Sequence, residues 1–160
     1  MTTDGQASMF LGKMVEVILN DSHADSDTVL AQHLRDAGLR PTRQRLLIAE
    51  LLLDGRHRHV SAESLAREIR DTGTHMAGGT VYNTLNQFTD AGLLRRVTVH
   101  NEHSVFDTNT EHHHHFFDAE RDQLIDIPAD AVTLASLPGA PEGHTIRSVD
   151  VLIHISPRDD

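Results

Sequence analysis

The 160-residue chain contains no cysteine. It therefore cannot form a disulfide bond, a thiolate zinc site or a cysteine nucleophile, and any metal ion must be bound by nitrogen and oxygen atoms. Tryptophan is also absent and aromatic residues make up only 4%, so we expect a core of leucine, isoleucine, valine and alanine. No apolar run is long enough to cross a bilayer, and the short run at residues 14–19 contains Glu16, which argues against a signal peptide. These absences favour a cytoplasmic protein that does not enter the membrane.

The net charge of −10 is distributed unevenly along the chain. Residues 1–27 contain one lysine and five acidic residues, and residues 28–100 contain ten arginines and seven acidic residues. Residues 101–160 contain three arginines and twelve acidic residues. A basic middle and an acidic final third indicate two domains with different partners.

The basic middle carries the start and stop signals of four helices, followed by a hairpin. In the fourth helix Val81, Leu85 and Phe88 recur at helical spacing and predict its buried face. The helices are expected to begin after Ser26 or Asp27, after Thr42, after Ser61 and at Thr80, and to end at Gly38, Gly55, Gly73 and Asp90. The hairpin strands are expected at residues 93–99 and 104–108. This pattern predicts a winged helix-turn-helix.

The fourth helix is the predicted recognition helix, because such a helix places its N-terminal residues against base edges in the major groove. Those residues are Thr80, Tyr82 and Asn83. Tyr82 lies off the apolar stripe and is expected to face DNA, although packing against the second helix is an alternative. Arginines at two places are expected to bind phosphates or the minor groove. They are Arg40, Arg43 and Arg45 before and in the second helix, and Arg95 and Arg96 in the hairpin.

Four consecutive histidines, residues 112–115, open the acidic third and precede Phe116 and Phe117. Side chains alternate in a strand, so His113 and His115 would share one face and His112 and His114 the other. Each pair offers two nitrogens to a borderline metal ion or to haem iron. A solvated histidine tract without a ligand is the alternative.

Short strands are expected at residues 113–117, 124–127 and 145–155, with a helix at 129–137. The long apolar last strand would leave an exposed edge in a monomer, which favours a homodimer. The chain is therefore expected to be α+β, with an N-terminal extension at 1–27, a winged-helix DNA-binding domain at 28–108 and a small α/β dimerisation and sensing domain at 109–160.

Four stretches together resemble the ferric uptake regulator (Fur) family, over about residues 30–155. They are LRDAGLRPTRQR at 34–45, HVSAESL at 59–65, GTVYNTLNQF at 79–88 and AGL at 91–93. Within that family, FDTNT at 106–110, which leads into the histidines, is most similar to the iron response regulator, Irr. The resemblance implies a dimeric regulator that binds double-stranded operator DNA and controls iron-homeostasis genes. Irr-type proteins respond to haem, whereas the alternative is a Fur repressor that responds directly to Mn, Fe or Zn.

The resemblance also implies ligand positions. The family's sensory metal site falls on His59, Asp107, His113 and His115, with Asp126 as a further candidate. A second site falls on His112 and His114 on the opposite face, and these residues with His113 are the haem candidates. The usual distal histidine of the second site is Val149 here. The four-cysteine zinc site and the Cys-Pro haem motif of some relatives are absent.

Two functions of another class remain open, a histidine-rich metalloenzyme and a metal buffer. The sequence contains no His-Glu-x-x-His, Gly-x-Ser-x-Gly or P-loop motif, so we do not expect an enzyme. A buffer has no need for a recognition helix that carries Tyr82.

Overall fold

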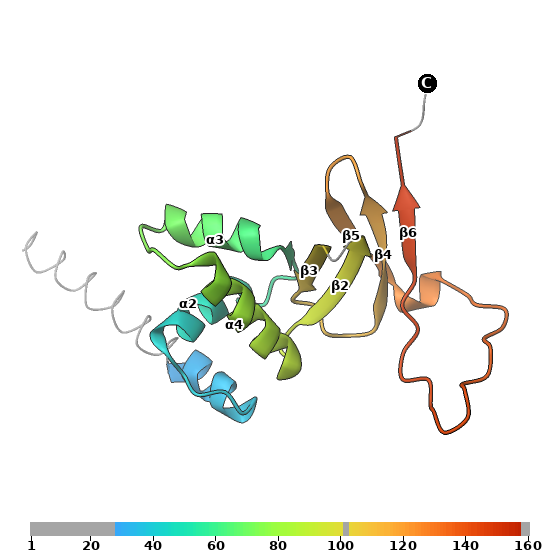
Figure 1. The fold of residues 1–160 in the computed structure, drawn as a ribbon, viewed down its shortest axis with the longest axis horizontal. Coiled ribbons are helices and arrows are strands. Elements are labelled where there is room, and N and C mark those ends of the chain that lie inside the picture. Colours follow the sequence, from blue (N-terminus) through green and yellow to red (C-terminus); the bar gives the residue numbers. More distant parts are fainter. Residues whose placement is uncertain (1–27, 101–102, 158–160) are drawn as a thin grey trace, which may run out of the picture.

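The computed structural model describes residues 28–100 and 103–157. The predicted extension at 1–27 lies outside the described residues. The winged half, residues 28–108, holds the helices and a first small sheet, and the second half, residues 109–157, holds a second sheet (Figure 1). Residues 28–36 are helical, and the remaining elements follow in chain order. They are α2 (Arg43–Leu52), β1 (His59–Val60), α3 (Ala62–Asp71), α4 (Gly78–Asp90), β2 (Arg95–His100), β3 (His103–Asp107), β4 (His113–Asp118), β5 (Gln123–Pro128), the 3-10 turn η1 (Ala129–Ala131) and β6 (Leu152–Ile155).

Helices α2 and α3 begin where side chains satisfy their first backbone N–H groups. The Thr42 hydroxyl accepts a hydrogen bond from the N–H of Arg45 at 3.3 Å. Ser61 and Ser64 form a reciprocal capping box, in which each side chain accepts from the other's N–H at 3.0 Å. These contacts are worth about 0.5–2 kcal/mol per helix. Both predicted helix starts are confirmed.

The apolar face of α4 forms the centre of the first core. Val81, Leu85 and Phe88 are fully buried, as predicted, together with side chains of the neighbouring helices and of the strand β3. Strands β2 and β3 form an antiparallel hairpin beside these helices. The winged helix-turn-helix prediction is therefore confirmed.

The two-residue strand β1 was not predicted from the sequence. It pairs with β3, so that the first small sheet has the order β1-β3-β2, and it places His59 directly opposite Asp107. This pairing brings a residue from the loop after α2 next to the last residue of the wing.

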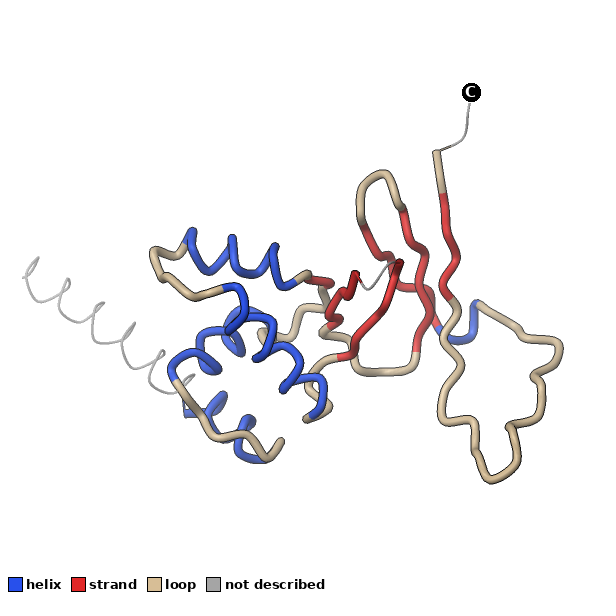
Figure 2. The backbone as a smooth tube through the Cα atoms, viewed as in Figure 1, coloured by secondary structure: helices blue, strands red, loops and turns tan. Residues whose placement is uncertain are grey.

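The second sheet has the order β5-β4-β6, with β4 in the middle (Figure 2). Strand β5 runs antiparallel to β4 and β6 runs parallel to it. Phe117 of β4 is buried with Val99 and Val105 of the wing hairpin. The wing therefore packs on the second sheet through a small core of its own.

Two predictions for the last third are wrong. The helix expected at 129–137 is only the turn η1, and the strand expected at 145–155 is only β6. Between them, residues 132–151 form no helix or strand. A short helix needs a surface on which to bury its apolar face, and Leu134 and Leu137 are about half exposed in this single chain.

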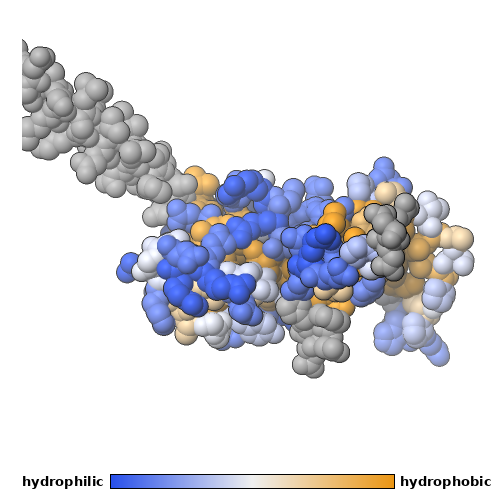
Figure 3. All heavy atoms as spheres, turned by 90° about the horizontal axis from the view of Figure 1, so that it is seen from above, coloured by the Kyte–Doolittle hydropathy of each residue, from blue (hydrophilic) through white to orange (hydrophobic). Residues whose placement is uncertain are grey.

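Hydrophilic residues cover much of the face shown in Figure 3, with hydrophobic residues reaching the surface in patches over both halves. The large hydrophobic side chains exposed in the last third are Ile125, Leu134, Leu137, Ile146 and Ile153. Within the described residues, no helix has both the length and the apolar character needed to cross a bilayer.

Candidate metal centre

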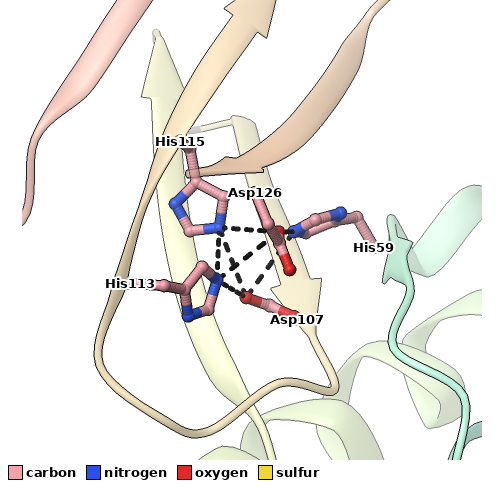
Figure 4. A group of neighbouring side chains, drawn as sticks. All are labelled: His59, Asp107, His113, His115 and Asp126. Carbon is pink, nitrogen blue, oxygen red and sulfur yellow. Dashed lines mark hydrogen bonds and ion pairs between the residues drawn. The ribbon is translucent and has the colours of Figure 1, made fainter. Parts of the chain in front are cut away.

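Five side chains meet where the two halves of the molecule join (Figure 4). They are His59 of β1, Asp107 at the end of β3, His113 and His115 of β4, and Asp126 of β5. Each contributes one nitrogen or oxygen atom, and these five atoms lie within 4.8 Å of one another. Both halves of the molecule contribute to this cluster.

The distances within the cluster suit one shared ion. Nε2 of His113 lies 2.9 Å from Nε2 of His115 and 2.9 Å from Oδ2 of Asp107. Oδ1 of Asp126 lies 3.0 Å from Nε2 of His59, 3.5 Å from that of His113 and 3.6 Å from that of His115. With ligands at about 2.1 Å from an ion, adjacent ligand atoms are about 3.0–3.4 Å apart and opposite ones about 4.2 Å.

One buried nitrogen of the cluster lies close to two carboxylates without forming a hydrogen bond to either. Nε2 of His59 is buried and forms no hydrogen bond, although it lies 3.0 Å from Asp126 Oδ1. A buried polar atom without a hydrogen bond costs about 1–3 kcal/mol. A cation that accepts its lone pair would remove that cost, so the residues present fit a metal ion.

The other nitrogen of His113 prepares this side chain as a ligand. Its Nδ1 lies 2.8 Å from the carbonyl oxygen of Glu111 and donates its proton to it. The lone pair of the neutral ring is then on Nε2, which faces the cluster. Such a hydrogen bond fixes the tautomer and orientation of a metal-ligating histidine.

Asp107 is the most buried member of the cluster, with an exposed fraction of 0%. Burial alone raises the pKa of its carboxyl. A hydrogen bond from His115, the nearby imidazole of His59 and the N–H of Asn109 together outweigh burial and hold the pKa well below its usual value. Asp107 is therefore a carboxylate that is ready to bind a cation.

Residues 108–112, between β3 and β4, form the hinge between the halves. Thr108 of this hinge holds the loop that carries His59. Its N–H donates to the carbonyl of Arg58 at 3.1 Å, and its hydroxyl oxygen accepts from the N–H of Arg58 at 2.8 Å. The same hydroxyl donates to the carbonyl of Arg56 at 3.2 Å. Three hydrogen bonds thus join Thr108, which follows Asp107, to the loop that precedes His59.

The alternation of the histidine run is as predicted. The rings of His113 and His115 lie 4.5 Å apart on one face, and those of His112 and His114 lie 5.1 Å apart on the other. His112 is exposed, whereas His114 is buried and its Nδ1 accepts the N–H of Val151 at 3.3 Å. In the described part of the chain, His112 and His114 belong to no group of three or more potential ligands. The sequence prediction of a second site there, and of haem at residues 112–114, gains no support from this geometry.

The predicted recognition residues all belong to α4 but differ in exposure. Tyr82 is 43% exposed and Asn83 is exposed, while Thr80 is half-buried. The ring of Tyr82 contacts Phe106 of β3 edge to face, with ring centres 6.2 Å apart. Tyr82 therefore rests on the wing and still presents part of its ring to solvent.

The predicted arginine contacts divide into two groups. Arg40 and Arg43 are exposed, and their guanidinium groups form no hydrogen bond or ion pair within the described residues. Arg45 differs, because it donates to Oε1 of Gln87 at 2.9 and 3.2 Å and to the carbonyl of Arg40 at 2.6 Å. Arg45 thereby ties α2 to α4, and its predicted contact with DNA stays a prediction.

Both wing arginines also have partners inside the molecule. Arg96 hydrogen-bonds Asn86 of α4 and lies over the ring of Phe106, 5.8 Å from its centre. Arg95 contacts the carbonyl of Glu111 and the carboxylate of Asp150. These links were not predicted from the sequence. The contact between Asn109 and Asp107 was not predicted either, although an aspartate side chain often accepts the N–H of the residue two positions later in a turn.

The profile of the Ferric uptake regulator family matches residues 36–152. The chain is 39% identical to the ferric uptake regulation protein of Vibrio cholerae over 102 residues, which is 63% of this chain and 68% of that protein. It is 45% identical to that of Vibrio anguillarum over 83 residues, 52% of this chain and 56% of that protein. The match thus spans between just over half and about two thirds of these relatives.

Solved structures with the same fold include two ferric uptake regulators. The crystal structure from Vibrio cholerae is 30% identical, has a TM-score of 0.61, and covers 78% of this chain and 96% of its own. The structure from Pseudomonas aeruginosa with manganese is 24% identical, with a TM-score of 0.63, and covers 82% of this chain and 99% of its own. The second likeness establishes the fold alone.

Proposed function

We propose that this chain, which belongs to the ferric uptake regulator family, is a DNA-binding transcription regulator controlled by a divalent metal ion. The ion would be held by His59, Asp107, His113, His115 and Asp126. One observation carries the proposal: five nitrogen and oxygen donors from both halves of the molecule converge within 4.8 Å. Three imidazoles and two carboxylates suit Mn²⁺, Fe²⁺ or Zn²⁺.

The position of the cluster supports a role in control rather than in storage. A bound ion would supply positive charge that attracts all five donors at once. His59 extends from the winged half, and His113, His115 and Asp126 extend from the second sheet. The distance between these groups depends on the angle between the halves, so drawing them together favours one orientation of α4 relative to the sheet.

The DNA contacts would come from the winged half, residues 28–108. The exposed ends of Tyr82 and Asn83 suit base edges, and the half-buried Thr80 lies one turn away at the start of α4. Arg40 and Arg43 have the unoccupied guanidinium groups that phosphate binding requires. Arg45 would act indirectly, by holding α4 against α2.

Residues 109–160 would form the dimerisation half. The apolar side chains exposed there leave a surface that a second copy of the chain would cover. A twofold dimer places two recognition helices on two half-sites of a palindromic operator. We propose no enzymatic activity, and we propose that the protein acts in the cytoplasm.

The identity of the signal has two candidates. One is a direct response to Mn²⁺, Fe²⁺ or Zn²⁺. The other is an Irr-like response, in which haem changes DNA binding at iron-homeostasis genes. Support for haem comes from the sequence resemblance alone.

Selection from random double-stranded DNA tests the proposal. The purified chain is incubated with the library in the presence of Mn²⁺, of haem with Mn²⁺, or of a chelator, and bound DNA is sequenced. We expect Mn²⁺ to enrich a palindromic sequence that the chelator does not enrich. Loss of that enrichment on adding haem would identify the Irr-like response. Equal enrichment with Mn²⁺ and with chelator would contradict metal control.

A further inference from the structure

We propose that Asn109 is a positioning residue that orients both carboxylate ligands of the metal centre and thereby favours Mn²⁺ and Fe²⁺ over Zn²⁺. The inference rests on the proposed function, because it concerns the same five-residue cluster. Asn109 itself lies in the hinge between β3 and β4 and contributes no atom to the cluster.

The backbone of Asn109 holds the first carboxylate. Its N–H donates to Oδ1 of Asp107 at 2.8 Å. The second oxygen, Oδ2, is left facing the imidazoles, at 2.9 Å from Nε2 of His113 and 3.3 Å from that of His115. Asp107 therefore presents one oxygen to the cluster, while the other oxygen accepts a hydrogen bond from the hinge.

The side chain of Asn109 holds the second carboxylate. Its Nδ2 donates to Oδ2 of Asp126 at 3.4 Å, and Oδ1 of Asp126 is then the oxygen nearest His59. Asp126 belongs to β5 and its side chain is 34% exposed, so it has more freedom than the fully buried Asp107. A hydrogen bond to its outer oxygen limits that freedom.

The direction of the Asn109 amide is itself fixed. Its Oδ1 accepts the N–H of Glu111 at 3.2 Å, which turns the NH₂ group toward Asp126. The carbonyl of the same Glu111 accepts the proton of His113 Nδ1 at 2.8 Å. One short turn therefore orients three of the five ligands.

This arrangement bears on which ion is preferred. With Asn109 in place, each carboxylate offers a single oxygen, and the cluster has five separate donor atoms. Zn²⁺ in proteins is most often four-coordinate, whereas Mn²⁺ and Fe²⁺ accept larger sets rich in carboxylate oxygen. If Asp126 turned away, four donors would remain, and the loss would weaken Mn²⁺ binding more than Zn²⁺ binding.

The test compares the full chain with two variants and a matched control. Asn109→Ala removes the amide but keeps the backbone N–H that binds Asp107. Asn109→Asp keeps the shape and the acceptor for Glu111, suits the same turn, and places an oxygen where the donor to Asp126 was. Thr110→Ala alters the exposed neighbour. Affinities for Mn²⁺ and Zn²⁺ are measured by chelator competition, and the visible absorption of bound Co²⁺ reports the coordination number.

We expect both Asn109 variants to weaken Mn²⁺ binding by about 10-fold or more, as loss of a supporting contact does in other metal sites, and to weaken Zn²⁺ binding less. Co²⁺ absorption should strengthen toward the four-coordinate intensity, a change that a general loss of stability would not produce. An unchanged Mn²⁺/Zn²⁺ affinity ratio and Co²⁺ spectrum in folded Asn109→Asp would overturn the inference while the proposed function stands. If the parent chain bound none of these ions, both would fail.

Discussion

The guanidinium of Arg95 donates to Oδ1 of Asp150 at 2.6 Å, across 55 positions of sequence. Arg95 lies on β2, directly opposite Asp107 in the wing sheet, and Asp150 precedes β6. Another nitrogen of the same guanidinium lies 2.9 Å from the carbonyl of Glu111, which also accepts the His113 proton. This ion pair therefore fastens the wing to the second sheet beside the proposed metal site.

Arg95→Ala is expected to reduce the coupling between metal binding and DNA binding by about 0.5–2 kcal/mol. The ion pair alone contributes little, because its side chains are 22% and 53% exposed and such pairs are worth about 0–1 kcal/mol. Arg95→Ala removes both the ion pair and the contact with the Glu111 carbonyl, whereas Asp150→Asn removes only the ion pair. Asp150→Asn should therefore reduce the coupling less. DNA affinity with Mn²⁺ and with chelator measures the coupling, and equal effects of the two substitutions would contradict this assignment.

Arg40→Ala should affect DNA binding, whereas Arg45→Ala should affect the stability of the fold. Arg40 is exposed, so its loss should weaken binding to all DNA sequences and lower the salt slope by about one, with an unchanged melting temperature. Arg45→Ala should lower the melting temperature, because it removes the contacts to Gln87 and to the Arg40 carbonyl. Salt titrations and thermal melts distinguish the two. A lower melting temperature for Arg40→Ala alone would reverse our assignment.

Tyr82 offers a test of sequence discrimination. Tyr82→Phe keeps the ring against Phe106 and removes only the hydroxyl group. We expect the preference for the selected operator over random DNA to fall by about 1–3 kcal/mol if the hydroxyl binds a base, without loss of stability. Tyr82→Ala should lower both the preference and the stability. An unchanged preference in both variants would place recognition elsewhere on α4.

The lowered pKa of Asp118 makes part of the folding stability depend on pH. The side chain of Arg121 lowers the pKa of this carboxyl, assisted by the backbone N–H groups of Arg121 and Glu120 and opposed by burial. A lowered folded pKa stabilises the fold above the unfolded value of about 3.9, and this stability is lost as the pH falls through the folded pKa. Asp118→Asn should therefore lower the melting temperature at pH 6, and the difference from the parent should shrink below pH of about 4. A difference that is constant with pH would exclude this origin.

Much of the winged half was predictable, because its signals are local. Thr42 and Ser61 cap helices wherever their hydroxyls reach the first free N–H groups, and Val81, Leu85 and Phe88 repeat at the helical period. The alternation of His113 and His115 likewise follows from strand geometry. The same logic failed at 129–137 and 145–151, where local propensity lacks a surface to pack against in the single chain.

Contacts between residues far apart in the sequence were not predictable from local patterns. Arg45 meets Gln87 and Arg95 meets Asp150 only after the chain has folded. Strand β1 is too short to give a sequence period, yet its pairing sets His59 opposite Asp107. The family resemblance indicated the five ligand candidates, whereas the contacts of Asn109 with both carboxylates form only in the folded structure.

The central claim, that a metal ion shared by the two halves sets DNA affinity, is tested most directly at His59. This residue is the one cluster member that the loop after α2 supplies, and His57→Ala is the control, since His57 is an exposed histidine of the same loop. The measurement is the ratio of operator affinity at saturating Mn²⁺ to that with chelator. We predict a ratio of about 5–150 for the parent and for His57→Ala, and a ratio near one for His59→Ala. The same ratio in His59→Ala as in the parent would contradict the account.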